Sequence, residues 1–423
     1  MRFIVIFVYT ILYNLSQYMK RSGSADLPLH GGHVPIWLSE RMAKLGLAIV
    51  ETIAMEFSTS EVISKLANPF WFQSFGAVMG MDWHSSGITT SVLGALKKSV
   101  NPHAKELGIY ICGGKGKNST KTPKELLLVG ERTGLNGMEL AGLSRLTAKV
   151  DNTAIQDGFQ LYQHNFIVNT KGDWCVIQQG MNNDTGTARR YHWHSENLQS
   201  FVNEPHTFIY GQNQGKILNL TAASAAETRD KSLLIVNEHP DKVIKEINHL
   251  ILPNHHDVRI KDVNMKRLGA MLWVAHENKP EDFEELLMLK GMGPRTIQSV
   301  ALVSEIIYGT PTRFDDPARF SFAHGGKDGH PFPVPVKVFD ETITTLQTAI
   351  QRAKIGNSDK MDAIRKLSEI SRNAEKDFTP NTNFDALIQK ERNESYKYGG
   401  RTIFGEAKPP KRKGGDSNQL ELF

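Results

Sequence analysis

Cysteine, long apolar runs and internal repeats are scarce or missing in this chain of 423 residues. Its two cysteines, Cys112 and Cys175, do not have the spacing of a metal-binding or redox motif. Two cysteines exclude a disulfide-stapled scaffold and suit a reducing compartment. We therefore expect a cytoplasmic protein.

An apolar stretch lies near the N-terminus, at residues 3–15. A membrane-spanning helix needs about 20 such residues, so we expect no stable membrane association. No small-residue cleavage site follows cleanly, as a signal peptide requires. We favour translation from Met19, which makes residues 1–18 a non-native or disordered extension. A short buried or fraying helix is the alternative.

The overall composition is that of an ordinary globular protein, with 40% hydrophobic and 22% charged residues. The length suffices for two or three domains. A net charge of +5 permits nucleic-acid binding without arguing for it alone.

Helical periodicity dominates both halves of the chain, and a strand pattern interrupts it in the middle. "LYQHNFIVNTKGDWCVIQQGM" predicts two strands joined at Lys171 and Gly172. The sequence thus predicts a mainly α protein with a small β element (α+β). We expect a helical domain at 19–150, a mixed segment with a β-hairpin at 151–226, a helical domain at 227–400, and a disordered tail at 401–423.

The sharpest internal motif is "FEELLMLKGMGPRTIQSVALVSEIIYG", residues 283–309. Gly291 and Gly293 predict a tight turn between two helices, with Pro294 in the first turn of the second helix. Such a turn aims helix N-terminal N–H groups at one point, which suits a DNA phosphate. The segment resembles the helix-hairpin-helix motif, and a plain helical hairpin is the alternative. The expected DNA-binding residues are Lys290, Gly291, Gly293, Arg295 and Thr296.

In helix-hairpin-helix DNA glycosylases, a catalytic aspartate follows the hairpin. Asp315 and Asp316 occupy that region here and are the candidate catalytic residues. Bifunctional members carry a lysine where this chain has Arg295, and arginine does not form a Schiff base. The spacing to the aspartates is also longer than the family pattern. In the alternative interpretation, Asp315 caps a helix or turn before Pro317.

A divalent-metal site is a further hypothesis. Two histidines three residues apart and an Asp-Trp-His run provide ligand types that metals use. The candidates are His30, His33, Asp82 and His84. Local turn structure is the alternative, and the sequence identifies no cofactor.

Two basic clusters are also candidate nucleic-acid contacts. "GGKGK" offers Lys115 and Lys117 in a loop whose backbone could cradle phosphate, although it lacks the full P-loop pattern. "ARRYHWH" combines Arg189 and Arg190 with aromatic rings. Basic groups beside rings on which bases can stack are typical of proteins that bind unpaired nucleic acid. The alternative for the GGKGK cluster is an exposed flexible loop. The alternative for the ARRYHWH cluster is a strand edge with solvated arginines.

The middle segment departs from the acid-rich pattern of a metal-dependent nuclease. Asp157 precedes the predicted hairpin and Asp173 lies in it. Gln178 and Gln179 occupy the place where an acid is needed, and glutamines hold a metal ion poorly. A metal-dependent nuclease is therefore a weaker hypothesis than a glycosylase or a non-catalytic DNA-binding module.

The last residues, "QLELF", resemble the peptide that binds the bacterial sliding clamp. Leu422 and Phe423 would fill an apolar pocket beside Gln419 and Leu420. The preceding Pro/Gly/Lys-rich linker would supply reach. DNA and a bacterial sliding clamp are therefore the expected partners, and a chance apolar end is the alternative.

Residues 19–332 resemble the prokaryotic family known as domain of unknown function 763. The resemblance rests on "RSGSADLPLHGGHVP", "WFQSFGAVMGMDWHSSG", "GGKGK", "DWCVIQQGM", "ARRYHW" and "DDPARFSFAHGGKDG". It implies no mechanism. The combined features predict a DNA-binding protein of repair or replication-linked maintenance. Such a protein is expected to be associated with the nucleoid. A glycosylase-like enzyme recruited by the sliding clamp is the first hypothesis, and the alternatives are a non-catalytic module that recognises DNA structure and a metal-dependent nuclease.

Overall fold

The computed structural model describes residues 27–28, 34–81, 86–196, 198–249, 265–318, 336–375, 401–402 and 405–406. Contacts divide the chain into a unit of Met1–Lys376 and a second of Asp377–Phe423. The domain boundaries predicted after residues 150 and 226 both fall inside the first unit. In the second unit, β10 (Arg401–Thr402) pairs with β11 (Gly405–Glu406). The metal candidates His30, His33, Asp82 and His84, the N-terminal extension and the clamp peptide lie outside the described residues.

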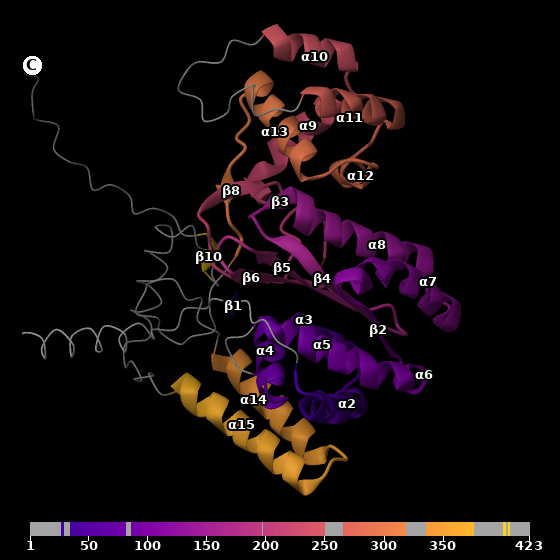
Figure 1. Cartoon of the computed structure of the whole chain (residues 1–423), viewed down its shortest axis with the longest axis vertical. Coiled ribbons are helices and arrows are strands. Elements are labelled where there is room, and N and C mark those ends of the chain that lie inside the picture. The colour runs from indigo at the N-terminus through magenta and orange to yellow at the C-terminus, as the bar shows by residue number, and fades with distance from the viewer. Residues whose placement is uncertain are drawn as a thin grey trace, which may run out of the picture. The chain divides into compact units, whose positions relative to one another are not determined.

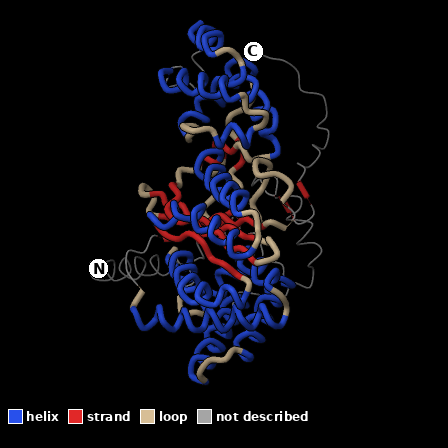
Figure 2. The backbone as a smooth tube through the Cα atoms, turned by 90° about the vertical axis from the view of Figure 1, so that its right-hand side faces the viewer, coloured by secondary structure: helices blue, strands red, loops and turns tan. Residues whose placement is uncertain are grey.

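A central antiparallel sheet separates two helical layers of the first unit (Figures 1 and 2). Its strand order is β1-β6-β5-β4-β2, and β7 pairs with β6. The strands are β1 (Leu27–Pro28), β2 (Ile109–Lys115), β4 (Gln160–Asn169), β5 (Trp174–Asn182), β6 (Thr187–His194) and β7 (Phe208–Tyr210). This mainly helical fold with a small β element confirms the predicted fold class.

The predicted β-hairpin is present as β4 and β5. Gly172 lies in the connecting turn at a φ of +93°, which glycine adopts without steric cost. Side chains alternate between the two faces of the sheet. Phe166 and Trp174 pack on one side, and Ile167 and Cys175 pack on the other.

The first helical layer, lower in Figure 1, consists of α2 (Ile36–Glu56), α3 (Thr59–Ala67), α4 (Pro69–Val78), α5 (Gly87–Val100), α14 (Val336–Arg352) and α15 (Asn357–Glu375). Ser58 caps α3 by accepting the Glu61 N–H. Asn68 caps α4 by accepting two N–H groups, and Pro69 occupies its first turn. Every residue of α4 is buried, so its sequence is apolar almost throughout. α3 and α5 pack on one face of the sheet, and α14 and α15 pack on the outer side of α2 and α4.

The second layer, upper in Figure 1, contains α7 (Thr122–Thr133), α8 (Gly137–Lys149), α9 (Ala226–Asn237), α10 (Pro240–His249), α11 (Met265–Asn278), α12 (Phe283–Met288) and α13 (Pro294–Tyr308). A small sheet of order β3-β8-β9 joins it: β3 (Ile155–Gln156), β8 (Lys216–Asn219) and β9 (Phe314–Asp315). A single π-helical turn, η3 (Val150–Ala154), continues α8. Short elements complete the chain: η1 (Asn101–His103), α6 (Ala104–Leu107), η2 (Gly116–Lys121) and η4 (Ala223–Ala225).

No helix within the described ranges combines the length and apolarity needed to cross a membrane.

Candidate functional site

One end of the central sheet is unusually polar for a buried region. Register aligns Lys115, Gln163, Gln179 and Arg190 across four strands, and the neighbouring row contains His164, Gln178 and Tyr191. Apart from the exposed Lys115, these side chains are buried. Buried polar groups are costly unless they are hydrogen-bonded, so this end of the sheet forms a network.

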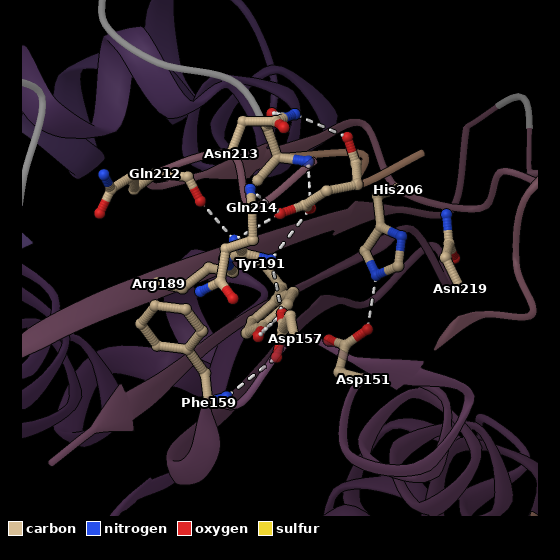
Figure 3. A network of polar contacts seen from close by, with 12 residues as sticks. Asp151, Asp157, Phe159, Arg189, Tyr191, His206, Gln212, Asn213, Gln214 and Asn219 are labelled. Atoms are coloured by element: carbon tan, nitrogen blue, oxygen red, sulfur yellow. Dashed lines mark hydrogen bonds and ion pairs between the residues drawn. The ribbon is translucent and has the colours of Figure 1, made fainter. Parts of the chain in front are cut away.

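Arg189 of β6 is the centre of a buried ion cluster (Figure 3). Its Nη1 lies 2.7 Å from Asp157 Oδ2, and its Nη2 lies 2.8 Å from Asp316 Oδ2. Its Nη2 also donates to the Gln212 carbonyl at 2.5 Å. Asp157 follows β3 and Asp316 follows β9, so Arg189 ties the central sheet to two distant segments.

The two carboxylates are hydrogen-bonded as well as ion-paired. Tyr191 donates its hydroxyl to Asp157 at 2.6 Å. Asp316 accepts the backbone N–H groups of Gln214 and Ala318. The two carboxylates therefore have few unused lone pairs, whereas the buried Nε of Arg189 has no hydrogen-bond partner among the described residues.

Burial and charge act in opposite directions in this cluster. Burial lowers the pKa of the Arg189 guanidinium, but the two carboxylates raise that pKa by more. Burial raises the pKa of Asp157, and the attraction of Arg189 offsets only part of the rise. The net result is a guanidinium that stays charged and a carboxyl group that is harder to ionise.

A second buried network centres on Asp151, which lies in η3 (Figure 3). The Asp151 carboxylate accepts from the Gln178 amide at 2.5 Å, the Trp193 indole at 3.0 Å and His206 Nε2 at 2.5 Å. Because a carboxylate only accepts, the proton on His206 is assigned to Nε2. Single-turn π-helices frequently mark functional positions.

The network continues into the core from Gln178. His164 donates from Nδ1 to Gln178 Oε1 at 2.9 Å, and Ser144 donates to His164 Nε2 at 2.8 Å. Burial lowers the pKa of His164, so its ring stays neutral. Ser144 and His164 are buried, which separates this end of the chain of hydrogen bonds from solvent.

On the opposite face of β6, Arg190 has a different environment. Its Nη2 donates to Gln73 Oε1 at 2.7 Å, and the guanidinium lies over the rings of Phe72 and Tyr210. No carboxylate within the described ranges forms an ion pair with it. Burial therefore lowers the pKa of Arg190 to about 10.

A turn at residues 289–293 connects α12 to α13 and lies at the surface. Gly291 has a φ of +92°, and an added Cβ would lie 2.8 Å from Met271 Sδ. Gly293 is the N-cap of α13, and Pro294 follows at its first position. Lys149 Nζ donates to the Met292 carbonyl at 2.5 Å, and Gln156 Nε2 donates to the Pro294 carbonyl at 2.7 Å. Lys149 and Gln156 thus hold the turn and the start of α13 in place by hydrogen bonds to backbone carbonyl groups.

The structure separates the residues that the sequence grouped as catalytic. Asp316 is buried against Arg189, whereas the Asp315 side chain is 57% exposed and pairs with Lys216. β9 ends at Asp315 and places the two residues in different environments. Neither lies in a helix cap.

Arg189 and Arg190 differ from both sequence-based interpretations, since each is 0% exposed. They do not present their guanidinium groups to nucleic acid, nor do they lie solvated at a strand edge. Strand alternation buries one in each layer. Lys115 and Lys117 are exposed, but the Gly113 N–H beside them donates to Glu125 and is not available to a phosphate.

Sequence reasoning missed Asp151 and His206. Gln178, dismissed as a poor metal ligand, bridges His164 to Asp151. Asp151 and His206 are 55 residues apart and belong to no spaced motif. No local signal in the sequence indicates that they meet.

The fold thus defines an α+β protein that has a buried polar network at one end of its central sheet. The family model described as "Protein of unknown function (DUF763)" matches residues 23–334. The match covers most of the chain, which therefore belongs to the DUF763 family. No curated protein and no solved structure matches the chain significantly.

Proposed function

We propose that the protein binds the phosphate backbone of DNA through the α12–α13 turn, in repair or replication-linked genome maintenance. The observation that carries the proposal is the orientation of this turn. Its carbonyl groups at Met292 and Pro294 face Lys149 and Gln156. No described acceptor contacts the N–H groups of Gly291, Gly293 or Arg295.

Free N–H groups at the start of a long helix favour an anion, because the helix dipole adds positive potential there. α13 has 15 residues. The free N–H groups support the helix-hairpin-helix interpretation of the sequence. Thr296, a predicted DNA contact in the first turn of α13, is only 1% exposed, so its side chain does not face a phosphate bound there.

Three basic side chains lie next to the turn. Lys290 and Arg295 are exposed beside it, and Lys149 lies directly behind the Met292 carbonyl. Backbone contacts of this kind carry no sequence information, so the expected binding is independent of DNA sequence.

The glycosylase hypothesis at Asp315 and Asp316 receives less support than DNA binding itself. Both oxygens of Asp316 are occupied by Arg189 and by backbone N–H groups. Stabilising charge at a sugar would require that carboxylate to leave Arg189. DNA binding, and not glycosylase chemistry at Asp316, is therefore the proposed function.

The test is fluorescence anisotropy of labelled duplexes of unrelated sequence at several salt concentrations. Lys290→Ala and Arg295→Ala should each weaken binding to all duplexes. Each should also reduce the slope of log K against log salt by about 0.9, the value for one lost phosphate contact. Lys354→Ala is the matched control, because Lys354 is exposed in the distant α14–α15 connection. Equal slopes for all three variants would overturn the proposal.

We further propose that residues 419–423 dock on a bacterial sliding clamp. The support is the sequence "QLELF" at the end of a linker rich in proline, glycine and lysine. Binding would tether the protein near the DNA that the clamp encircles.

Biolayer interferometry with an immobilised bacterial clamp tests this docking. Removing residues 419–423, or the double change Leu422→Ala and Phe423→Ala, should abolish binding. Glu421→Ala should not, because that side chain would remain in water. Undiminished affinity of the truncated chain would rule out clamp docking by this peptide.

A further inference from the structure

His206 has one ring nitrogen that the Asp151 network does not use. Nε2 donates to Asp151, so Nδ1 of the neutral ring carries a lone pair. No hydrogen bond joins Nδ1 to any described residue. It is also not among the fully buried, unpartnered atoms of the described chain, whereas both ring nitrogens of His192 are. His206 therefore presents an unused proton acceptor at the edge of the buried network.

The orientation of this ring is fixed. The His206 side chain is 6% exposed. Its ring lies 4.4 Å from the Trp193 ring, centroid to centroid, and 6.2 Å from the Tyr191 ring. Asp151 is itself held by Gln178 and Trp193. A histidine oriented by a buried carboxylate, with its other nitrogen free, has the geometry of a general base.

The same short segment holds this pair and the proposed DNA-binding turn. Residues 149–156 include Lys149 and Gln156, which bind the turn carbonyls, and Asp151, which binds His206. A third tether runs from the loop before His206, where the Phe201 N–H donates to Glu284 of α12 at 3.1 Å. Three hydrogen bonds thus fix the His206 pair relative to the α12–α13 unit.

We propose that His206 is the general base of a DNA phosphodiester hydrolase and that Asp151 is its positioning residue. This inference rests on the proposed DNA binding, because residues 149–156 join the proposed DNA-binding turn to the His206 pair. Because the ligand proposed for the turn is the DNA backbone, the bond proposed for hydrolysis is a phosphodiester.

The proposed reaction is the hydrolysis of a phosphodiester by one water molecule. A water molecule gives one proton to His206 Nδ1 while its oxygen forms a bond to phosphorus. The bond from phosphorus to one ester oxygen breaks, and that oxygen leaves with the electron pair. It receives the proton that His206 had taken. The net reaction adds one water across the bond and gives a phosphate monoester and a hydroxyl end.

Asp315, Asp316 and His164 do not offer this chemistry. Asp316 is occupied by Arg189, and Asp315 is exposed and paired with Lys216. His164 lies in the core with both ring nitrogens bonded, to Ser144 and Gln178. Among the described histidines, His206 unites a buried carboxylate partner with a free nitrogen that is not sealed in the core.

The experiment uses the full chain and end-labelled DNA on denaturing gels, without alkali. The DNAs are a single strand, a duplex, a flap and a junction, each with Mg²⁺, Mn²⁺ or EDTA. The wild type should cleave at least one of them. His206→Gln should lower the cleavage rate at least 100-fold, and Asp151→Asn at least 10-fold. His239→Gln, at an exposed histidine, should leave the rate unchanged.

Two readouts separate catalysis from a structural role. Added imidazole should restore part of the rate of His206→Gly, and His206→Gln should lose the rise of rate with pH that a histidine base confers. The dissociation constant for DNA should stay within twofold in each variant. Duplex binding without cleavage of any substrate, or wild-type cleavage by His206→Gln, would overturn this inference alone. Absence of DNA binding would overturn the proposed function as well.

Discussion

Arg189 and Arg190 are neighbours in β6, yet their environments differ in kind. Arg189 pairs with two carboxylates that follow β3 and β9. Within the described ranges Arg190 has none, and its guanidinium lies over the rings of Phe72 and Tyr210, with amide and hydroxyl acceptors. Around Arg189, ion pairs join segments that are distant in the sequence. Around Arg190, a single positive charge lies against aromatic rings.

This difference indicates which layer depends on electrostatics. Removing one partner from a buried ion pair is strongly destabilising, because it leaves an uncompensated charge. Losing a buried guanidinium that has no carboxylate partner leaves only neutral acceptors. The two faces of the sheet should therefore respond differently to the same substitution.

The largest effect should come from Arg189→Met, measured by urea unfolding beside Arg190→Met. Arg189→Met should lower the free energy of unfolding by about 3–5 kcal/mol, because two carboxyl groups lose their counter-charge. Arg190→Met should lower it by about 1–2 kcal/mol, because neutral groups lose a hydrogen bond. Equal losses would show that charge does not distinguish the two layers.

A second comparison concerns the adjacent residues Asp315 and Asp316. Asp316→Asn should lower the free energy of unfolding by about 2–3 kcal/mol, since it weakens a buried charged contact and places an amide against donors. Asp315→Asn should change it by less than about 1 kcal/mol, because its pair with Lys216 is exposed. Thermal and urea unfolding of both variants measures the difference. A large loss of unfolding free energy in Asp315→Asn would contradict the conclusion that Asp316, and not Asp315, makes the stabilising contact with Arg189.

The sequence predicted the fold class, the β4–β5 hairpin and the α12–α13 turn, because each depends on local periodicity and glycine conformation. It did not predict that "ARRYHWH" is buried. Two arginines beside aromatic rings look like a nucleic-acid surface until the acids that neutralise one of them are known. Those acids lie 32 and 127 residues away from Arg189.

The Asp151–His206 pair could not be predicted for a related reason. Its geometry depends on a π-helical turn after α8 and on a loop before β7, which tertiary contacts place together. Local pattern fixes which residues are strand or helix. It does not fix which polar side chains meet across layers.

Acid titration compares one histidine from each layer. Burial lowers the pKa of His164, and burial together with the charge of Arg190 lowers that of His192 further, from the ordinary 6.5. Below pH 6.5 the unfolded chain binds protons that the folded chain does not, so stability falls as pH falls. Each histidine should contribute at most about 1.4 kcal/mol per pH unit, a limit reached where the ring is protonated in the unfolded chain and neutral in the folded chain.

Urea unfolding between pH 7 and pH 5 tests the two contributions. His164→Gln and His192→Gln should each flatten the pH dependence by one such contribution. The share of His192 should persist to lower pH, because its folded-state pKa is lower. An unchanged slope in His192→Gln would mean that this ring is protonated in the folded protein.

The smallest expected effect is kinetic and compares the two thiols. Cys112 faces the α7–α8 layer from β2, and Cys175 faces the α2–α5 layer from β5. Burial raises the pKa of Cys112 to about 12 and raises that of Cys175 as well, so neither thiol is reactive in the folded state. Labelling therefore requires local opening.

Single-thiol chains, made by Cys112→Ala and Cys175→Ala, allow the labelling rate of each remaining thiol to be measured with a disulfide reagent. β2 is at the edge of the described sheet and β5 is central, so Cys112 should react faster. Arg189→Met should raise the Cys112 rate more than the Cys175 rate, because Arg189 and Cys112 belong to the same layer. Equal acceleration of both would show that the two layers open together and that the contrast between Arg189 and Arg190 is confined to their immediate contacts.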